Sequence, residues 1–511
     1  MTLKARFCIS FLTLFSSSVS ATALDDYIAE PNPAYTWQLA GSGVFDLSTF
    51  TTGYTLSLTS QQWRDASEVE AGQAAWVHWV TVIVPALGNP GTALLLINGG
   101  DSSDPAPPID SQFRQLSIGT GSIVVVLTAV PNQPIHFADE AFSRSEDEII
   151  AYSWDKFLNG GDAYWPAQLP MVKAVTACMD AVQEFVDQHT SKTVNHFVLT
   201  GGSKRGWTAW LTAAVDGRVT AVAPIVSDLL NMKRSFAHHW ACYGFWADAL
   251  QPYEDMGIFD WFDSPQTDAL LEIVDPYQYR DRLTLPKYLI MAAGDDFFVS
   301  DSAQFYIHKL TGETYMRIVP NTNHYLDGAM DTVFAGMAPY YDAFLNGAAR
   351  PVFDWTVEED GTIRVETTTA PNAVNLWQIT NPAARDFRLL TTGANWTSSP
   401  LADQGSGEYL GHVSEPASGW TAYYVELIFP GRSLGGTTYD YRFSTEMVVL
   451  PEILPFETDF SRDGTTNLDD LAIFTESWLT GNAYRDIQPR RGGDDWVNLP
   501  DLALFGLHWL E

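Results

Sequence analysis

The sequence predicts a doubly wound α/β domain with a mostly parallel sheet, followed by an all-β sandwich and a small helical module. Short apolar runs alternate with helical patterns up to about residue 350, which is typical of a parallel sheet covered on both faces. Residues 351–455 read as strands separated by Gly, Pro and Asn turns, without a helical period. Near the C-terminus, DLAIFTESWL (470–479) returns as DLALFGLHWL (501–510), which indicates a duplicated helix.

Length, charge and composition limit the class of protein. A chain of 511 residues is too long for one core, so several domains are expected. The net charge of −34 argues against nucleic acid as a partner, and no segment after the N-terminus is apolar enough to span a bilayer. Cys178 and Cys242 either form a disulfide or remain free buried thiols, and both alternatives stay open.

The N-terminus has the features of a secretory signal peptide, residues 1–23. Lys4 and Arg6 precede a short apolar run (7–15), and Ala-Thr-Ala (21–23) fits a cleavage site, so the mature chain would start at Leu24. We therefore expect a protein that is secreted or lies in the periplasm or at the cell surface.

The α/β domain is expected to span residues 24–350. ALLLING (93–99) and SIVVVLTAVP (122–131) predict buried strands, and helical spacing of apolar residues predicts a helix over 165–186. A helical, aromatic-rich segment around 236–280 interrupts the alternation of strands and helices, and we expect it to form a cap over the end of the sheet.

The last module, residues 456–511, contains a sequence that resembles an EF-hand calcium loop. Oxygen-bearing residues occupy positions 1, 3, 5, 7, 9 and 12, with Gly464 at the sharp turn. These six ligands are Asp459, Ser461, Asp463, Thr465 through its carbonyl, Asn467 and Asp470. Hard oxygen ligands in this order predict a structural Ca²⁺ site, and the alternative is an acidic surface turn.

The second copy of the loop departs from this pattern. It keeps Asn498 and Asp501, but Arg490 stands at position 1 and Asp495 stands where glycine is expected. Whether the second loop binds calcium therefore stays open.

Residues 194–212 read as a nucleophile elbow. Residues 196–200 predict a buried strand, Ser203 follows a Gly-Gly turn, and a helix begins directly after it. The usual pattern is Gly-x-Ser-x-Gly, whereas here the second glycine, Gly206, comes one place late and Arg205 holds the expected small position. The stretch predicts a catalytic serine, and the alternative is an ordinary strand–turn–helix.

A serine nucleophile needs a base and an acid that orients it, in the chain order Ser, Asp or Glu, His. His324 follows a predicted strand and is the best base among the ten histidines. The acid is expected just after the strand that ends at Gly294. We choose Asp296, with Asp295 as the near alternative and Asp301 as the more distant one.

An oxyanion hole would use the backbone N–H of Lys204 and an N–H at Gly99 or Gly100, where an earlier strand ends. The side chains of Lys204 and Arg205 oppose the dipole of the helix that they begin. Such cations are expected only where carboxylates pair with them or where the substrate is anionic.

Other polar residues have less specific interpretations. His238 and His239 lie in the expected cap and either line the pocket or pack as buried helix residues. The acidic patch 146–148 is more typical of a capping or salt-bridge feature than of a site.

Long motifs carry a resemblance to a known family. LDDYIAEPNPAYTWQL, LTSQQWRDASEV, LLLINGG, QLPMVKAV, TGGSKRGWTAWLT and GDDFFVSDS resemble the PhoPQ-activated pathogenicity-related proteins over residues 24–455. This resemblance implies an α/β-hydrolase fold with a Ser/Asp/His arrangement at Ser203, Asp296 and His324. The tail resembles a type I dockerin, which implies a module that docks to a cohesin-like or cell-surface partner or onto its own enzyme. The elbow alone is also similar to that of glucuronoyl esterases.

These features together predict a secreted serine hydrolase with no catalytic cofactor. We expect a carboxylic-ester hydrolase that acts on polysaccharide-linked or anionic esters, either in an extracellular polymer or in a small ester. One alternative is a serine peptidase or aminopeptidase whose residues 146–148 bind a peptide N-terminus. The other is a non-catalytic binding protein attached through its dockerin-like tail.

Overall fold

The computed structural model describes residues 21–88, 91–482, 485–488, 494 and 496–509. Most of the expected signal peptide, residues 1–20, lies outside this part of the chain. The first helix, α1 (Ala23–Ala29), begins at a capping box in which the Thr22 N–H donates to the Asp25 carboxylate at 2.7 Å. None of the described helices is long and apolar enough to cross a membrane.

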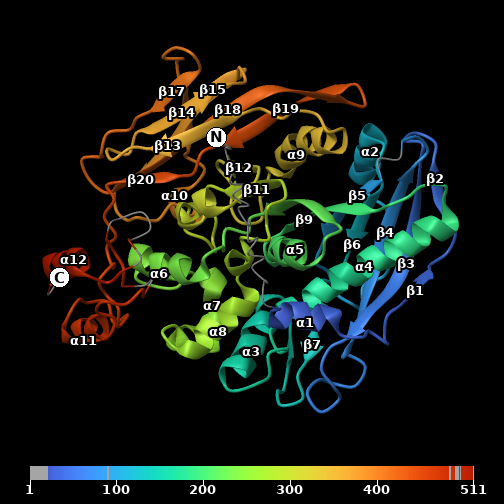
Figure 1. The fold of residues 1–511 in the computed structure, drawn as a ribbon, viewed down its shortest axis with the longest axis horizontal. Helices are drawn as coiled ribbons and strands as arrows, with labels where there is room; N and C mark the ends of the chain where they lie inside the picture. The colour runs from blue at the N-terminus through green and yellow to red at the C-terminus, as the bar shows by residue number, and fades with distance from the viewer. Residues whose placement is uncertain (1–20, 89–90, 483–484, 489–493, 495, 510–511) are drawn as a thin grey trace, which may run out of the picture.

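A ten-stranded mixed sheet forms the centre of the molecule (Figure 1). The strand order is β1-β3-β4-β6-β5-β9-β10-β11-β12, with β2 paired to β3. In this order, neighbouring strands from β6 through β5, β9, β10 and β11 to β12 are parallel. The remaining pairs, which involve β1, β2, β3 and β4, are antiparallel. The strands are β1 (Thr36–Leu39), β2 (Val44–Asp46), β3 (Thr51–Gln62), β4 (Ala75–Pro85), β5 (Thr92–Ile97), β6 (Val124–Leu127), β9 (His196–Gly202), β10 (Val219–Ile225), β11 (Lys287–Ala292) and β12 (Thr314–Val319). The prediction of a mixed α/β sheet with helices is confirmed.

Helices cover both faces of this sheet because its central strands are apolar on both sides. On one face lie α1, α4 (Gln168–His189) and α5 (Lys204–Val215), and on the other lie α2 (Ser111–Thr120) and α9 (Met330–Leu345). Side chains alternate accordingly along β5, where Leu95 belongs to the α4 side and Leu94 to the α2 and α9 side. The connection after β6 holds the short pair β7 (Ile135–His136) and β8 (Ser143–Arg144) and then α3 (Asp147–Leu158).

The segment expected to form a cap is helical, but it packs at the side of the sheet against α3 and α5 (Figure 1). It consists of α6 (Met232–Tyr243), η1 (Asp248–Leu250), α7 (Gln251–Asp255), η2 (Ile258–Trp261), α8 (Pro265–Val274) and η3 (Pro276–Tyr279). Two short turns, η4 (Ser302–Phe305) and η5 (Ile307–Lys309), follow β11.

Beyond residue 350 the chain forms two antiparallel sheets. The first is β13-β14-β17, and the second is β16-β15-β18-β19 with β20 beside β18. Their bounds are β13 (Phe353–Val357), β14 (Ile363–Thr367), β15 (Ala373–Asn381), β16 (Thr397–Pro400), β17 (Glu408–Gly411), β18 (Trp420–Leu434), β19 (Thr437–Ser444) and β20 (Val448–Leu450), with the short helix α10 (Leu389–Thr392) between β15 and β16. Residues of both sheets belong to the same hydrophobic core as the main sheet, and the Ser444 hydroxyl accepts the Ile318 N–H of β12 at 2.9 Å. The expected boundary at residue 350 therefore crosses a shared core.

A buried ion cluster also crosses this boundary. Arg385 Nη2 lies 2.6 Å from Asp301 Oδ2, and His238 Nε2 lies 2.7 Å from Asp301 Oδ1. Burial alone would lower the pKa of His238, but the adjacent Cys242 and Asp301 raise it to about 9. Cys242 is a free thiol, as is Cys178, so the two do not form a disulfide.

The tail module contains the two expected helices, α11 (Leu468–Glu476) and α12 (Leu499–Leu507). They pack through a small core of their own, in which the rings of Phe474 and Phe505 stack with centroids 5.4 Å apart. The module rests on the helical segment of the first domain (Figure 1), where Arg485 pairs with Asp263 at 2.9 Å.

We predict that Arg385→Ala destabilises the whole protein. The change leaves the buried Asp301 carboxylate with His238 as its ionic partner, and the loss of one partner of a buried ion pair costs about 3–5 kcal/mol. Urea unfolding measures the loss, with Arg364→Ala as a control because Arg364 pairs with glutamates at the surface. Equal midpoints for the two variants would show that the Asp301 ion pair does not join the two parts of the chain.

Candidate active site

Ser203 occupies a strained turn between β9 and α5. Its backbone has φ 55° and ψ −126°, a left-handed conformation that a residue other than glycine seldom adopts. The turn is held by the Ser203 N–H, which donates to the Ile225 carbonyl of β10 at 2.8 Å. A strained serine at a strand-to-helix turn is the geometry of a nucleophile elbow.

The structure explains why the second glycine of the elbow comes late. A Cβ on Gly206 would lie 2.9 Å from both the Gly201 carbonyl oxygen and the Ser227 Cβ, and a Cβ on Gly201 would lie 2.9 Å from Arg205 backbone atoms. Gly202, by contrast, has open space where its Cβ would be. The close approach of α5 to β9 therefore depends on Gly201 and Gly206, and Gly202 is not part of it.

His324 is oriented by Asp295 and not by Asp296, the acid that we predicted. The His324 Nδ1 atom lies 3.0 and 2.9 Å from the two Asp295 carboxylate oxygens, and both side chains are buried. The Asp295 carboxylate also accepts the backbone N–H of Phe297 and of Phe298 at 2.8 and 3.2 Å. This local turn points Asp295 toward His324. Asp296 is half-buried, and burial and the neighbouring Asp295 charge raise its pKa.

Ser203 and His324 line the same cavity, which has a volume of about 1060 Å³ and is called the catalytic cavity below. Because Nδ1 of His324 faces Asp295, its Nε2 is the nitrogen left for chemistry. Nε2 is buried and has no hydrogen-bond partner among the described residues. A buried proton acceptor without a partner that lines the same cavity as a serine is compatible with a nucleophile–base pair, whose hydrogen bond often forms only when a substrate is bound.

The candidate oxyanion donors lie at two places beside Ser203. Lys204 is the first residue of α5, and it lines the cavity together with Gly99 at the end of β5. A Cβ on Gly99 would lie 2.6 Å from Arg205 Nη2, so a larger residue there would displace the guanidinium. Gly100, with φ 114°, is not among the residues that line the cavity.

Carboxylates neutralise the two cations beside the serine. Lys204 Nζ lies 2.7 Å from Glu146 Oε2 and 2.8 Å from Asp147 Oδ2, and Arg205 Nη2 lies 2.6 Å from Glu146 Oε1. Burial alone would raise the pKa of Glu146, but Arg205 and Lys204 lower it to about 2. The acidic patch 146–148 therefore supplies ion-pair partners, and an anionic substrate is not needed to explain these cations.

The histidines of the expected cap do not reach the cavity. No residue of the described segment 236–280 lines it, and both His238 and His239 are packed in α6. The His239 Nε2 accepts the Ala247 N–H at 3.1 Å, and burial lowers the pKa of His239 to about 3.

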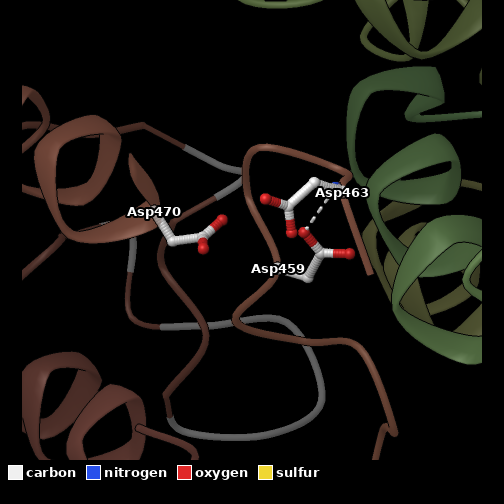
Figure 2. Close-up of side chains that lie close together, drawn as sticks. All are labelled: Asp459, Asp463 and Asp470. Atoms are coloured by element: carbon white, nitrogen blue, oxygen red, sulfur yellow. Dashed lines mark hydrogen bonds between the residues drawn. The ribbon is translucent and has the colours of Figure 1, made fainter. Parts of the chain in front are cut away.

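The first loop of the tail brings three of the expected calcium ligands together (Figure 2). Carboxylate oxygens of Asp459, Asp463 and Asp470 lie within 4.8 Å of one another. Oxygens that bind one Ca²⁺ at about 2.3–2.6 Å are separated by such distances, so these residues fit the ion. The Gly464 N–H donates to Asp459 at 2.9 Å, and the positive φ of 88° at Gly464 makes the sharp turn.

The second loop is built differently from the expectation. Arg490 and Asp495 lie outside the described residues. The Asp494 N–H donates to the Asp486 carboxylate at 3.1 Å, as the Asp463 N–H does to Asp459 in the first loop. Asp486 therefore holds the position in the second loop that Asp459 holds in the first, and Arg234 of α6 pairs with it at 2.9 Å. The sequence analysis missed Asp486 because the two loops differ in length between this first position and the helix that follows.

The sheet and the order of three of its loop residues resemble those of a known class of proteins. A mixed α/β sheet with a strained serine after one strand, followed by an aspartate and a histidine after two later strands, is the arrangement of α/β hydrolases. The sequence model of the PhoPQ-activated pathogenicity-related proteins matches residues 24–388, and the chain belongs to this family.

Known proteins resemble the chain at different levels. Autocrine proliferation repressor protein A of Dictyostelium discoideum is 36% identical over 481 residues, which cover 88% of this chain and 95% of that protein. Acetyl xylan esterase 1 from Thermoanaerobacterium sp. JW/SL YS485 has a TM-score of 0.41 and 16% identity, covering 62% of this chain and 91% of its own. S-formylglutathione hydrolase from Agrobacterium tumefaciens has a TM-score of 0.38 and 12% identity, covering 61% and 100%. Structural likeness of this strength leaves the chemistry to be argued from the site.

We predict that two glycine substitutions four residues apart differ in their effect on the free energy of unfolding. Gly206→Ala forces α5 away from β9 and destabilises the protein by about 1–3 kcal/mol, the usual cost of overpacking. Gly202→Ala has room for its methyl group and changes the free energy of unfolding by less than about 0.5 kcal/mol. Chemical unfolding measures both, and a Gly202→Ala variant that is the less stable of the two would contradict this account of the elbow.

Proposed function

We propose that this protein is a serine hydrolase that cleaves carboxylic esters. Ser203 is the nucleophile, His324 is the general base and Asp295 orients His324. The observation that carries the proposal is the strained Ser203 turn in the same cavity as the buried, unpartnered Nε2 of His324, whose other nitrogen is held by Asp295.

The reaction follows from these positions. Ser203 Oγ attacks the ester carbonyl carbon while its proton passes to His324 Nε2, and the imidazolium is stabilised by Asp295. The carbonyl oxygen becomes an oxyanion beside the backbone N–H of Lys204 and the end of β5 at Gly99. The bond to the alcohol oxygen breaks as His324 returns the proton to it. Water then attacks the acyl-enzyme, gives its proton to His324, and releases the acid and Ser203.

The residues around Ser203 reduce the range of esters that we expect as substrates. Lys204 and Arg205 are neutralised by Glu146 and Asp147, so an anionic ester loses the support that free cations would provide. A polysaccharide-linked alcohol stays part of the proposal, supported by the signal-like N-terminus and the dockerin-like tail. The protein is accordingly proposed to be secreted, or to lie in the periplasm or at the cell surface.

The tail is proposed to bind one structural Ca²⁺ through Asp459, Asp463 and Asp470, with Ser461, Thr465 and Asn467 as further ligands. The acidic cluster within 4.8 Å supports this. When bound, the ion neutralises carboxylates that otherwise repel one another. A cohesin-like or cell-surface partner is proposed for the outer face of the tail, where Leu468 and Leu499 start the duplicated helices and are 69% and 70% exposed.

The alternatives differ in the support that they have. A peptidase that binds a peptide N-terminus through residues 146–148 is disfavoured, because Glu146 is already paired with two cations. A non-catalytic binding or signalling protein is the second candidate, favoured by the name of the Dictyostelium relative, which is that of a repressor of proliferation.

We predict that Asp295 and Asp296 differ in their effect on catalysis. Asp295→Asn removes the charge that orients His324 and lowers kcat by about ten-thousandfold, as in other triads. Asp296→Asn, next to it in the chain, keeps most of the activity. The measurement is hydrolysis of p-nitrophenyl esters together with labelling by a fluorophosphonate probe, with Ser203→Ala as the unlabelled control. Labelling of the Ser203→Ala variant by the probe would contradict the proposal that Ser203 is the nucleophile.

We predict that calcium stabilises the tail. At a concentration of one hundred times Kd, the ion adds about 2.7 kcal/mol to the stability of the unit that binds it, and EGTA removes this gain. Asp463→Ala abolishes the response of Tm to calcium, whereas Asp469→Ala preserves it because Asp469 is exposed and outside the cluster. Differential scanning calorimetry measures both variants, and an identical response in both would contradict the site.

A further inference from the structure

The catalytic cavity extends far beyond the reacting atoms. Its wall includes Leu94 and Leu96 of β5 and Val198 of β9, on the sheet face that carries α2 and α9. Leu96 is partly exposed although β5 is a central strand, whereas Leu95 on the opposite face is 0% exposed. The sheet face beneath α2 and α9 is therefore open to the cavity.

Helices α2 and α9 form the opposite wall. Phe113 of α2 and Phe334 of α9 meet edge to face with ring centroids 6.0 Å apart, and both line the cavity. The lining continues along α9 from Met330 to Tyr341, which is about 16 Å at 1.5 Å per helical residue. The cavity is thus long as well as large, and its volume of about 1060 Å³ is at the upper end of small-molecule sites.

The hairpin of β18 and β19 closes the far end. It reaches across α9 toward α2 (Figure 1), and Leu434, Thr437 and Tyr439 belong to the cavity wall. Leu434 is 6% exposed, and a Cβ on Gly119 at the end of α2 would lie 3.5 Å from its Cβ. The second part of the chain therefore limits the length of the cavity.

Charge is confined to the catalytic end. Among the described lining residues, every Asp, Glu, Lys and Arg lies at the start of α2, α3, α5 or α9, which are the helix ends nearest Ser203. These residues are Asp110, Glu146, Asp147, Lys204, Arg205 and Asp331. The remainder of the wall is mainly aliphatic and aromatic, so it favours an apolar group.

We propose, resting on the ester hydrolysis argued above, that the substrate carries a long unbranched hydrocarbon acyl chain. The acyl carbonyl lies at Ser203, and the chain runs along Leu96 and between α2 and α9 toward the β18–β19 hairpin. The alcohol part stays at the charged catalytic end, outside the apolar part of the cavity. Each methylene that enters the cavity raises kcat/KM by about fourfold, because burial of that group is favourable.

The test is kcat/KM for p-nitrophenyl acetate, butyrate, octanoate and dodecanoate. The wild type is expected to prefer the longer chains. Ala335→Trp and Leu96→Trp each fill the cavity from one wall and lower the dodecanoate-to-acetate ratio by about a hundredfold or more. Ala349→Trp, the same change at an exposed residue after α9, keeps the wild-type ratio. Two blocking variants are made in case one of them does not fold. Circular dichroism shows whether each variant is folded.

The outcomes separate this inference from the proposed function. A wild type that prefers acetate, with a ratio unchanged in both blocking variants, overturns the acyl cavity and leaves the hydrolase intact. If no ester is hydrolysed and the probe does not label Ser203, the hydrolase proposal fails. Calorimetric titration of the Ser203→Ala variant with dodecanoic acid then tests whether the cavity binds an acyl chain. Binding that Ala335→Trp abolishes supports an acyl site, and absence of binding overturns it.

Discussion

The contact between Gly201 and Gly206 is the constraint on which the candidate site depends. It allows the first turn of α5 to approach the end of β9, and this approach forces Ser203 into a left-handed conformation. A conformation of that kind costs on the order of 1–3 kcal/mol and persists only where its surroundings hold it. Here the Ile225 carbonyl and the ion pairs of Lys204 and Arg205 with Glu146 hold the turn from two sides.

The segment from Asp295 to Asp301 connects the site to the rest of the chain. At one end Asp295 orients His324, and at the other Asp301 is fixed by His238 and by Arg385, which lies beyond the expected domain boundary. The second part of the chain therefore contributes to the candidate site in two ways. It anchors this segment from behind, and its β18–β19 hairpin closes the catalytic cavity.

The sequence predicted the features that depend on local chemistry. Strands β5, β6 and β11 were predictable because strands buried on both faces must be apolar. Ser203 and His324 were chosen as candidates because each follows such a strand. The choice between Asp295 and Asp296 was not predictable, because the direction of the side chain depends on the turn made with Phe297 and Phe298.

Features that depend on distant contacts were missed or misplaced. The helices of 236–280 were predicted, but their position beside α3 and the tail depends on tertiary packing, so their absence from the cavity wall could not be read from the chain. Asp486 was missed because its equivalence to Asp459 appears only in the hydrogen bond to Asp494. The sequence did contain a signal for the ion pairs of Glu146, since two cations at the start of a helix are expected only with nearby carboxylates or an anionic substrate.

The pairing of these cations also decides how the site can select a substrate. A free Lys204 or Arg205 beside Ser203 would attract any anion, but the molecule carries a net charge of −34 and supplies carboxylates of its own. With the local charges neutralised, recognition depends on shape and apolar burial. The wall formed by Leu96, Phe113 and Phe334 provides both, and it lies where an acyl group attached to Ser203 would extend. The arrangement that holds the nucleophile in its strained turn therefore also favours an apolar substrate over a charged one.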